Sequence, residues 1–331
     1  MPSDLLQRAK SGDHEAFTAL VDPHRRELQV HCYRMLGSLQ DAEDALQETL
    51  LSAWIGIDSF EGHSSVRTWL YRVATNRCLS MLRSSSRRPV SVEPRPDWLA
   101  EPSRLGEVAW LQPYPDTLLD GLPDEAPGPE ARYESREAIS LAFVTAMQLL
   151  PPNQRAVLLL RDVLGYRASE VADLLGLTED AANSALKRAR ASVDASRNPA
   201  APPPAPDSPA ERELLERFVA AFTDLDVDAL LALMADDAWV SMPPMPFEYR
   251  GAEAVRRFFT TIRPSHSRFD RLVPVRANGQ PAWGAYQRDS IAGTLRLTSI
   301  FVITLAGDHV SEFIRFETTL APYFCLPRTL D

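Results

Sequence analysis

Apolar residues recur with the period of a helix between residues 167 and 193, in two segments separated by a short turn. Gly176 ends the first segment, and Ser169 and Thr178 are residue types that cap the first turn of a helix. The pattern therefore predicts a helix-turn-helix. In its second helix the apolar residues fall at i, i+3, i+4 and i+7 and form one buried stripe: Ala182, Ala185, Leu186, Ala189 and Val193.

Outside this stripe, the predicted second helix carries polar and basic residues. A recognition helix packs by one face and contacts the bases or phosphates of duplex DNA with the other. A pair of amphipathic helices with a solvated basic face gives the same pattern, so the motif alone leaves both interpretations open. The candidate residues for duplex DNA are Thr178, Asn183, Ser184, Lys187, Arg188 and Arg190.

The first 88 residues are also helical by periodicity, with a break at Gly37 and Ser38. The next helix, which Ser38 or Asp41 can cap, starts with acidic residues. These suit the positive end of the helix dipole and also make a negative surface for a partner, although a solvated helix start is the alternative. A loop at residues 58–66 then leads into the most basic helix of the chain. A basic helix beside aromatic residues suits single-stranded DNA.

Proline marks two linkers. Of the 27 prolines, nine lie in residues 89–129 and six in residues 199–209. Proline-rich segments act as extended spacers. The chain is therefore predicted to have folded parts at residues 1–88, 130–197 and 209–331, joined by linkers at 89–129 and 198–208.

Helical patterns precede alternating strand patterns in residues 209–331, which predicts an α+β fold with helices covering a curved antiparallel sheet. A sheet of this kind usually encloses a pocket. Asp289 and Glu317 are carboxylates of the type that act as bases in apolar cavities, but no acid–base pair stands out. Pocket and hydrophobic core both explain the candidate lining residues Trp239, Met242, Tyr249, Trp283, Tyr286 and Phe316.

The net charge of −10 is unfavourable for a protein that binds DNA unaided, because such affinity rests on neutralised phosphates. DNA contacts must be local, or a partner supplies much of the affinity. The three cysteines are far apart and lack the spacing of a zinc site, so neither a disulfide framework nor a metal or cofactor is expected. The sequence shows no signal peptide and no apolar run near the ~18 residues of a membrane span, which predicts a cytoplasmic protein without membrane insertion.

Three motifs precede the helix-turn-helix in a fixed order: DAEDALQETLLSAW, then F-x-G-x-x-S-x-R-T-W-L-x-R-V-A-x-N, then L-P-x-x-Q-R-A-V-L-L-L-R-D-V. Together they resemble the extracytoplasmic-function group of bacterial sigma-70 factors, and three ordered motifs are far more specific than one. The resemblance implies two all-α sigma domains, region 2 at residues 1–88 and region 4, with the helix-turn-helix, at residues 130–197.

The resemblance also implies core RNA polymerase and promoter DNA as partners, with the recognition helix on the minus-thirty-five element. Gln154, Arg155 and Arg161 are expected to contact phosphate or to pair with Asp162 or Glu170. The residues expected to dock on the clamp helices of the polymerase β′ subunit are Asp41, Glu43, Asp44, Gln47, Glu48 and Trp54. Those expected at the minus-ten element are Phe60, Ser64, Ser65, Arg67, Trp69, Arg72, Asn76, Arg83 and Arg87, with Trp69 equally suited to the core.

The C-terminal part resembles the SnoaL-like or NTF2-like cone fold. Its expected role is to regulate the sigma domains in cis or to sense a small-molecule ligand, and an anti-sigma protein is a further candidate partner. The first linker, with its apolar segment VAWLQPYPD, either threads the polymerase, β subunit included, or packs on one of the chain's own domains. Two other functions fit parts of the sequence: an isomerase or hydrolase with a DNA-binding leader, and a helix-turn-helix regulator that acts without polymerase. The second would have no use for residues 41–88.

Overall fold

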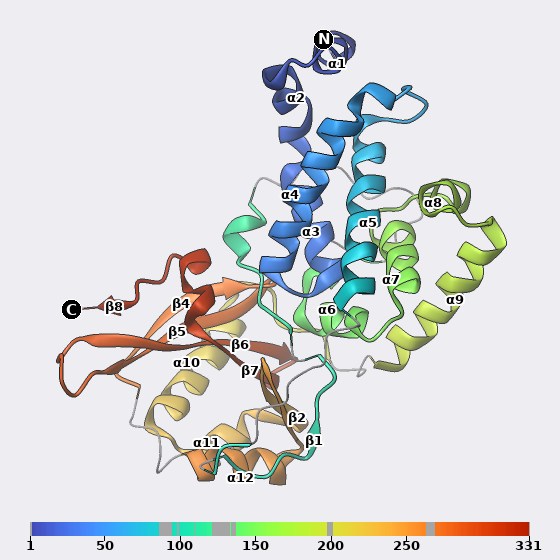
Figure 1. Ribbon diagram of the computed structural model, residues 1–331. Coiled ribbons are helices and arrows are strands. Elements are labelled where there is room, and N and C mark those ends of the chain that lie inside the picture. Colours follow the sequence, from blue (N-terminus) through green and yellow to red (C-terminus); the bar gives the residue numbers. More distant parts are fainter. Residues whose placement is uncertain are drawn as a thin grey trace. The chain divides into compact units, whose positions relative to one another are not determined.

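The computed structural model describes residues 2–85, 95–97, 99–108, 110–120, 133, 137–196, 201–262 and 269–330. The chain forms two compact units (Figure 1). Unit 1 contains Met1–Pro89 and Leu118–Arg197, and unit 2 contains Val90–Thr117 and Asn198–Asp331. Most of the described part of the first linker therefore belongs to the same unit as the C-terminal part of the chain. Arg87 of the predicted minus-ten set lies outside the described residues.

The N-terminal part of unit 1 is helical, as its periodicity predicts. Ser38 caps the fourth helix by accepting a hydrogen bond from the main-chain N–H of Asp41 at 3.1 Å. The third, fourth and fifth helices enclose a core that includes Leu28, Tyr33 and Leu70. The elements are α1 (Pro2–Lys10), α2 (His14–Val21), η1 (Asp22–His24), α3 (Arg25–Leu36), α4 (Leu39–Gly56), η2 (Ile57–Ser59) and α5 (Val66–Ser85).

The second part of unit 1 holds the predicted helix-turn-helix. Gly176 ends the first helix in the left-handed region, with φ 64°, and Thr178 Oγ1 accepts from the N–H of Ala181 at the start of the next. The prediction that Ser169 caps the first helix is wrong: the N-cap is Arg167, two residues earlier, and Glu170 accepts from the N–H of Arg167 at 2.7 Å. The elements are η4 (Glu137–Ile139), α6 (Leu141–Gln148), α7 (Pro152–Leu158), the π-helical turn η5 (Leu159–Val163), α8 (Ala168–Leu175) and α9 (Glu179–Ser196).

Unit 2 has the predicted α+β fold, with one sheet whose strand order is β1-β3-β2-β7-β6-β5-β4, and β8 paired to β6. Neighbouring strands are antiparallel except β2 and β7, which are parallel. The strands are β1 (Arg104–Leu105), β2 (Met234–Met242), β3 (Met245–Arg250), β4 (Arg271–Ala277), β5 (Gln280–Arg288), β6 (Leu295–Ala306), β7 (His309–Phe316) and β8 (Thr329–Leu330). The helices are α10 (Pro209–Asp224), α11 (Val227–Ala232) and α12 (Ala252–Ile262), with the 3-10 segments η3 (Asp116–Leu118) and η6 (Thr318–Phe324).

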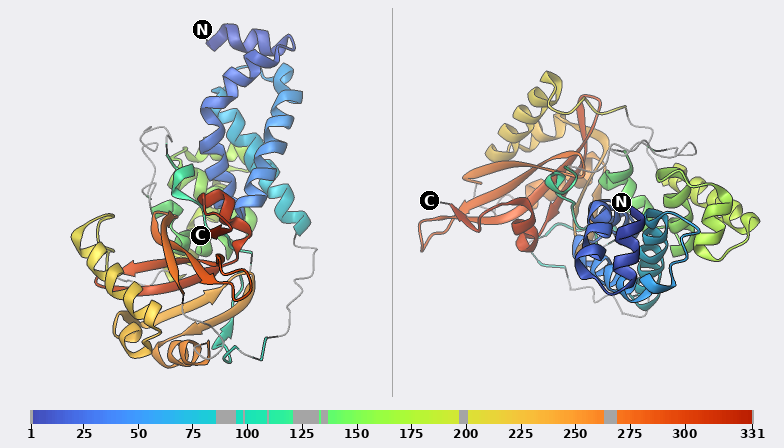
Figure 2. Two further views of the ribbon diagram at one scale, coloured as in Figure 1. Left: turned by 90° about the vertical axis from the view of Figure 1, so that its left-hand side faces the viewer. Right: turned by 90° about the horizontal axis from the view of Figure 1, so that it is seen from above.

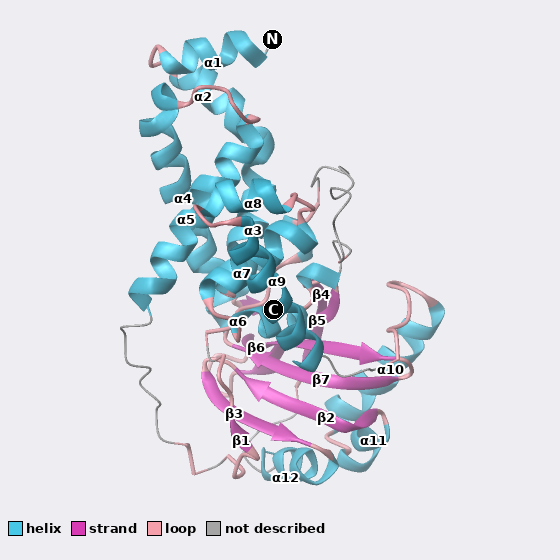
Figure 3. Cartoon of the chain, turned by 90° about the vertical axis from the view of Figure 1, so that its right-hand side faces the viewer, coloured by secondary structure: helices cyan, strands magenta, loops and turns pink. Residues whose placement is uncertain are grey.

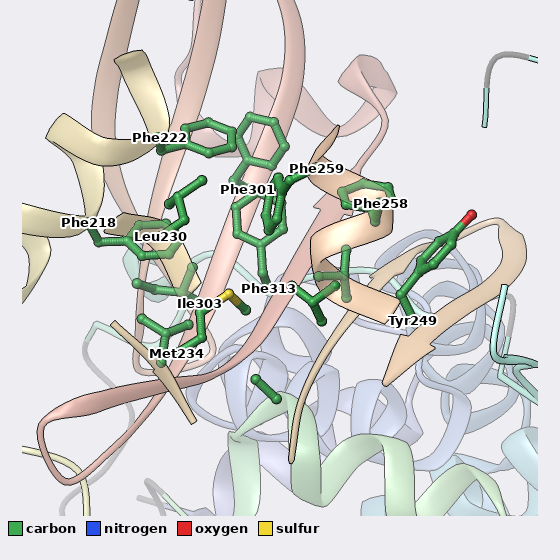
Figure 4. Close-up of a cluster of buried hydrophobic side chains, with 14 of the residues drawn as sticks. Phe218, Phe222, Leu230, Met234, Tyr249, Phe258, Phe259, Phe301, Ile303 and Phe313 are labelled. Atoms are coloured by element: carbon green, nitrogen blue, oxygen red, sulfur yellow. The ribbon is translucent and has the colours of Figure 1, made fainter. Parts of the chain in front are cut away.

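Helices α10, α11 and α12, the described α-helices of unit 2, cover one face of the curved sheet (Figures 2 and 3). Between these helices and the sheet lies a core of phenylalanine rings contributed by α10, α12, β6 and β7. Phe301 and Phe313 stack with their centroids 4.9 Å apart, and Phe222 meets both rings at 5.1 and 5.2 Å (Figure 4). Burial of these rings contributes hydrophobic stabilisation to the unit.

Candidate nucleic-acid and polymerase interface

Helix α9 presents the predicted division between a buried and an exposed face. All five residues of the predicted stripe are buried, and Asn183, Ser184, Lys187 and Arg188 are exposed. Thr178 is exposed as well, but its hydroxyl caps the helix. The exposed set has the hydrogen-bonding and cationic groups that duplex DNA requires.

Arg190 differs from the other basic residues of α9. Its Nε and Nη2 atoms donate to the two carboxylate oxygens of Asp162 at 2.8 and 2.6 Å. The Asp162 side chain is almost fully buried at 1% exposure, while Arg190 keeps 39%. The carboxylate also raises the pKa of Arg190, mainly through the hydrogen bond. The structure therefore places this candidate DNA contact in an ion pair with the scaffold of the helix.

The structure buries Arg155, so the expectation that it contacts phosphate or pairs with Asp162 or Glu170 is not met. Its guanidinium donates to Gln148 Oε1 at 2.6 Å and to main-chain oxygens of Gln148, Leu150 and Met35. Burial lowers the pKa of Arg155 to about 10. These carbonyls include the end of α3, where the orphan oxygens of a helix need donors. Arg155 thus joins α7 to the first helices of unit 1.

The predicted minus-ten residues divide into exposed and packed groups. Trp69 is half-buried against the buried ring of Phe60, with centroids 5.0 Å apart. Arg67 is half-buried, and its Nη2 lies 2.7 Å from Glu27 Oε2. The exposed members are Ser64, Ser65, Arg72, Asn76 and Arg83.

Glu27, which the sequence did not single out, organises this part of region α3–α5. Besides Arg67, it accepts from Tyr71 Oη at 3.1 Å and lies 2.7 Å from His24 Nδ1. Burial acts to raise the pKa of Glu27, but the hydrogen bonds from His24 and Arg67 outweigh it and lower the pKa. Arg67 also lies over the Tyr71 ring at 5.1 Å. The arginine is therefore already engaged on two sides within the protein.

Helix α4 combines acidic and apolar residues on its exposed surface. Asp41, Asp44, Gln47 and Glu48 are exposed and Glu43 is half-buried. Trp54 is half-buried because it stacks on His14 at 4.0 Å and meets Phe17 edge-on at 5.1 Å. Sequence reasoning missed Leu51 and Ile55, which are 60% and 73% exposed. They follow Asp44 and Glu48 at helical spacing, and exposed large apolar side chains beside charges are typical of a protein-binding surface.

The candidate pocket residues of unit 2 are packed in cores. Met242, Tyr249 and Trp283 belong to the phenylalanine cluster, and the Tyr249 ring packs on Phe258 (Figure 4). The Tyr249 hydroxyl donates to the carbonyl of Ala100 at 2.6 Å. Tyr286 and Phe316 are buried outside this cluster, and Trp239 is half-buried. Neither candidate carboxylate lies in this core. Asp289 is half-buried and accepts from main-chain N–H groups of its own loop, and Glu317 is exposed and precedes η6.

The first linker forms part of the sheet of unit 2. Arg104 and Leu105 pair with Glu248 and Phe247 of β3 as an added edge strand. Main-chain hydrogen bonds flank this pair, from Ser103 to Glu248 at 2.8 Å and from Gly106 to Pro246 at 2.7 Å. Leu99 and Ala100 enter the phenylalanine cluster. Of the two alternatives for the linker, the structure has it packed on one of the chain's own domains.

A second anchor holds the other end of this linker segment. Tyr114 is fully buried, and its N–H and carbonyl exchange hydrogen bonds with Asn278, at 2.7 Å to Oδ1 and 2.8 Å from the N–H. Asp116 accepts from the N–H of Gly279 at 2.8 Å and lies 3.7 Å from Arg276. The linker is therefore fixed at β3 and again at the β4–β5 turn.

Comparison with known proteins accounts for both units. The chain matches Sigma-70 region 2 over residues 20–88, Sigma-70 region 4 over residues 140–193 and the SnoaL-like domain over residues 215–313. It is 45% identical over 321 residues to ECF RNA polymerase sigma factor SigG of Mycobacterium tuberculosis, covering 95% of this chain and 85% of SigG. The chain belongs to the extracytoplasmic-function sigma factors. The predicted family and three-part fold class are thereby confirmed.

A second relative has the same layout. The sigma factor SigJ of M. tuberculosis is 31% identical over 241 residues, covering 71% of this chain and 69% of SigJ. The crystal structure of SigJ superposes with a TM-score of 0.60 at 23% identity, covering 92% of this chain and 97% of that one, which supports the fold. As a sigma factor, the chain binds core RNA polymerase and promoter DNA and directs transcription initiation. Among the described helices, none has the length and apolar character to cross a membrane.

Regions 2 and 4 of this sigma factor contact each other within unit 1. Arg34 of region 2 donates to the carbonyl of Ala138 at 2.9 Å, and Gln148 of region 4 donates to the carbonyl of Arg34 at 3.2 Å. Tyr71 meets Tyr166 edge-on, with centroids 6.2 Å apart. These contacts are not predictable from the sequence, because the partners are about a hundred residues apart and follow no local pattern.

Proposed function

We propose that this sigma factor holds promoter DNA at two points and core polymerase at a third. Helix α9 reads the minus-thirty-five duplex, the loop before α5 and α5 itself take the minus-ten strand, and the exposed surface of α4 binds the polymerase. The support is that each of these surfaces presents exposed side chains of suitable chemistry. They are Asn183, Ser184, Lys187 and Arg188 on α9; Ser64, Ser65, Arg72, Asn76 and Arg83 near α5; and Asp41, Asp44, Gln47, Glu48, Leu51 and Ile55 on α4.

We further propose that the SnoaL-like domain controls regions 2 and 4 in cis by holding the linker that joins them. The observation that carries this proposal is the pairing of Arg104 and Leu105 with β3, backed by the Tyr114–Asn278 clamp. Adding a strand to a sheet edge is a common mode of peptide capture, because main-chain hydrogen bonds supply the affinity. A tethered domain acts at high effective concentration, so weak contacts suffice.

The interior of the SnoaL-like domain supports cis control over ligand sensing. Its phenylalanines contact one another at centroid distances of 4.9 to 6.5 Å. Candidate lining residues such as Tyr249 and Trp283 pack into the same cluster. A site built for a small molecule needs a concave space with a few polar groups aimed into it, whereas the described aromatic side chains pack ring against ring.

Run-off transcription with core polymerase on genomic fragments tests both proposals. The samples are the full-length protein, a chain lacking residues 207–331, and the double variant Tyr249→Phe with Asn278→Gly, which removes one hydrogen bond at each linker anchor. We expect a defined promoter set for the full-length protein and altered transcript levels for the other two. Arg256→Ala, which breaks an exposed ion pair between α12 and Asp228 of α11, is the control.

The outcomes separate the two proposals. Absence of any promoter-specific transcript contradicts the assignment of the DNA and polymerase surfaces. Equal transcription from the full-length and shortened chains contradicts cis control alone, and leaves the rest standing.

A further inference from the structure

The recognition helix is fastened to its scaffold by one buried acidic group. Asp162 lies in η5, the wide turn that follows α7, and accepts both hydrogen bonds of the Arg190 guanidinium. Paired N–H donors on paired carboxylate oxygens fix the arginine in direction as well as in distance. Asp162 and Arg190 are 28 residues apart, so the contact spans the helix-turn-helix motif.

Asp162 depends on Arg190 for its burial. A carboxylate at 1% exposure has lost its water, and such a group needs a paired charge and hydrogen bonds. Arg190 at 39% exposure provides both from the side that faces solvent. If Arg190 turned toward a DNA phosphate, it would leave this carboxylate without its cation.

The turn that carries Asp162 is itself held on two sides. The Asp162 carbonyl accepts from the N–H of Tyr133 at 3.0 Å, and Arg161 donates to the carbonyl of Tyr166 at 2.9 Å. Helix α9 packs its apolar stripe on α7. An apolar stripe permits small rotations and shifts along the axis, whereas a two-bond ion pair to a fixed turn does not.

The basic residues of α9 are therefore of two kinds. Lys187 and Arg188 are exposed, one turn or less before Arg190. We infer that Arg190 is a positioning residue rather than a DNA contact: with Asp162 it sets the rotation and height of α9, so that Asn183, Ser184 and Lys187 meet the base edges. This inference rests on the proposed reading of the minus-thirty-five element by α9.

Replacement of Asp162 should change DNA affinity in opposite directions for the two possible roles of Arg190, phosphate contact or positioning residue. If Arg190 bound phosphate, Asp162→Asn would free a cation and remove a nearby anion, and DNA binding would become tighter. If Arg190 positions the helix, the same change weakens binding, and it weakens promoter binding more than binding to unrelated DNA. Because both residues would then act as one unit, the double variant should be no weaker than either single variant.

The experiment uses holoenzyme made from the full chain and core polymerase. Binding is measured against salt concentration on two duplexes, one with a promoter identified by run-off transcription and one of scrambled sequence. For Asp162→Asn and Arg190→Gln we expect about tenfold weaker promoter binding, in line with the loss of ordered base contacts, with the salt slope of the wild type. Arg190→Lys, which keeps one of the two bonds, should recover part of the loss.

Arg188→Ala is the matched comparison. If Arg188 contacts a phosphate, its loss should reduce the magnitude of the salt slope by roughly 0.9 on both duplexes. The inference is overturned if Asp162→Asn binds more tightly, if the two single effects add, or if Arg190→Gln lowers the slope as Arg188→Ala does.

Folding and function are controlled separately. Should Asp162→Asn fail to fold by circular dichroism, the salt slope and promoter preference of the half-exposed Arg190→Gln decide the question. Should the wild type fail to direct polymerase to any promoter, the proposed function fails, and the salt slopes of the free chains on the scrambled duplex at low salt still test Arg190.

Discussion

Gly37 ends α3 with its α-carbon directly against the side chain of Gln148. A β-carbon at this position would lie 2.8 Å from the Gln148 Cδ atom, and the glycine has φ 72°. The close approach allows the Gln148 amide to reach the carbonyl of Arg34. This glycine thus ends a helix of region 2 and, because it has no β-carbon, leaves room for a side chain from region 4.

Gly37→Ala should destabilise the chain through backbone strain and through this contact. We expect a loss of about 2–4 kcal/mol in the free energy of unfolding, since left-handed strain costs about 1 kcal/mol and overpacking adds about 1–3 kcal/mol. Urea unfolding followed by circular dichroism measures it. Gly12→Ala is the control: it has φ 88° but no neighbour within 4 Å, so only the strain remains. Equal losses for the two variants would show that the Gln148 contact contributes nothing.

His31 should make stability depend on pH between about 6.5 and 3. Burial, followed by the charge of Arg34, lowers the pKa of His31 from 6.5 to about 3. Below pH 6.5 the unfolded chain therefore takes up a proton that the folded chain refuses, and stability is lost as the pH falls toward 3.

The test compares His31→Gln with the wild type at about pH 7 and about pH 5. Each pH unit in this window is worth about 1.4 kcal/mol, so the wild type should lose about 2 kcal/mol more than the variant. His63→Gln, at an exposed histidine, should behave as wild type. The same pH dependence in all three proteins would exclude His31 as its source.

Leu51 and Ile55 should matter for polymerase binding and not for folding. Substitution of both by Asp should weaken binding to core polymerase at least tenfold, because exposed apolar residues at an interface centre carry much of its energy. The melting temperature should stay unchanged, given exposures of 60% and 73%. Ile291→Asp, at a 97% exposed residue of the C-terminal domain, is the control for an added charge. Unchanged affinity in a competition assay would remove these residues from the interface.

Linker capture should protect the bond after Arg104 from trypsin. In the wild type this residue is paired in β1, and proteases cut segments that can leave their hydrogen bonds. The double variant Tyr249→Phe with Asn278→Gly should be cleaved after Arg104 several-fold faster than the wild type. Mass spectrometry measures the cleavage rate, and Arg256→Ala is the matched control. Identical cleavage rates would mean that these two anchors do not hold the linker in solution.

The α9 stripe was predictable because its signal is local. Its residues recur at helical spacing, as Ala182, Leu186 and Ala189 do at intervals of four and three, and the period alone determines which side is buried. Thr178 as a cap and the α+β order of the C-terminal part were predictable for the same reason.

The roles of Arg67, Arg155 and Arg190 were not predictable in this way. Their partners Glu27, Met35 and Asp162 lie 40, 120 and 28 residues away, so only the fold brings them together. The sequence does not distinguish an arginine that is paired with a buried carboxylate from one that is exposed and able to bind phosphate.

Two further features needed the tertiary structure. Aromatic periodicity in residues 239–316 is the same for a pocket and for a packed core, and only the ring contacts around Phe222 distinguish them. The strand at Arg104 and Leu105 is too short for a period of two to register, and its partner is about 140 residues further along the chain.

The edge strand from the linker also bears on how such proteins are assembled from modules. The SnoaL-like sheet borrows β1, and its core borrows Leu99 and Ala100, from a segment that precedes it by about a hundred residues. The domain and this linker segment therefore form one structural unit that region 4 interrupts in the sequence. A C-terminal domain grafted from one sigma factor to another would arrive with its edge bare unless residues 95–117 travelled with it.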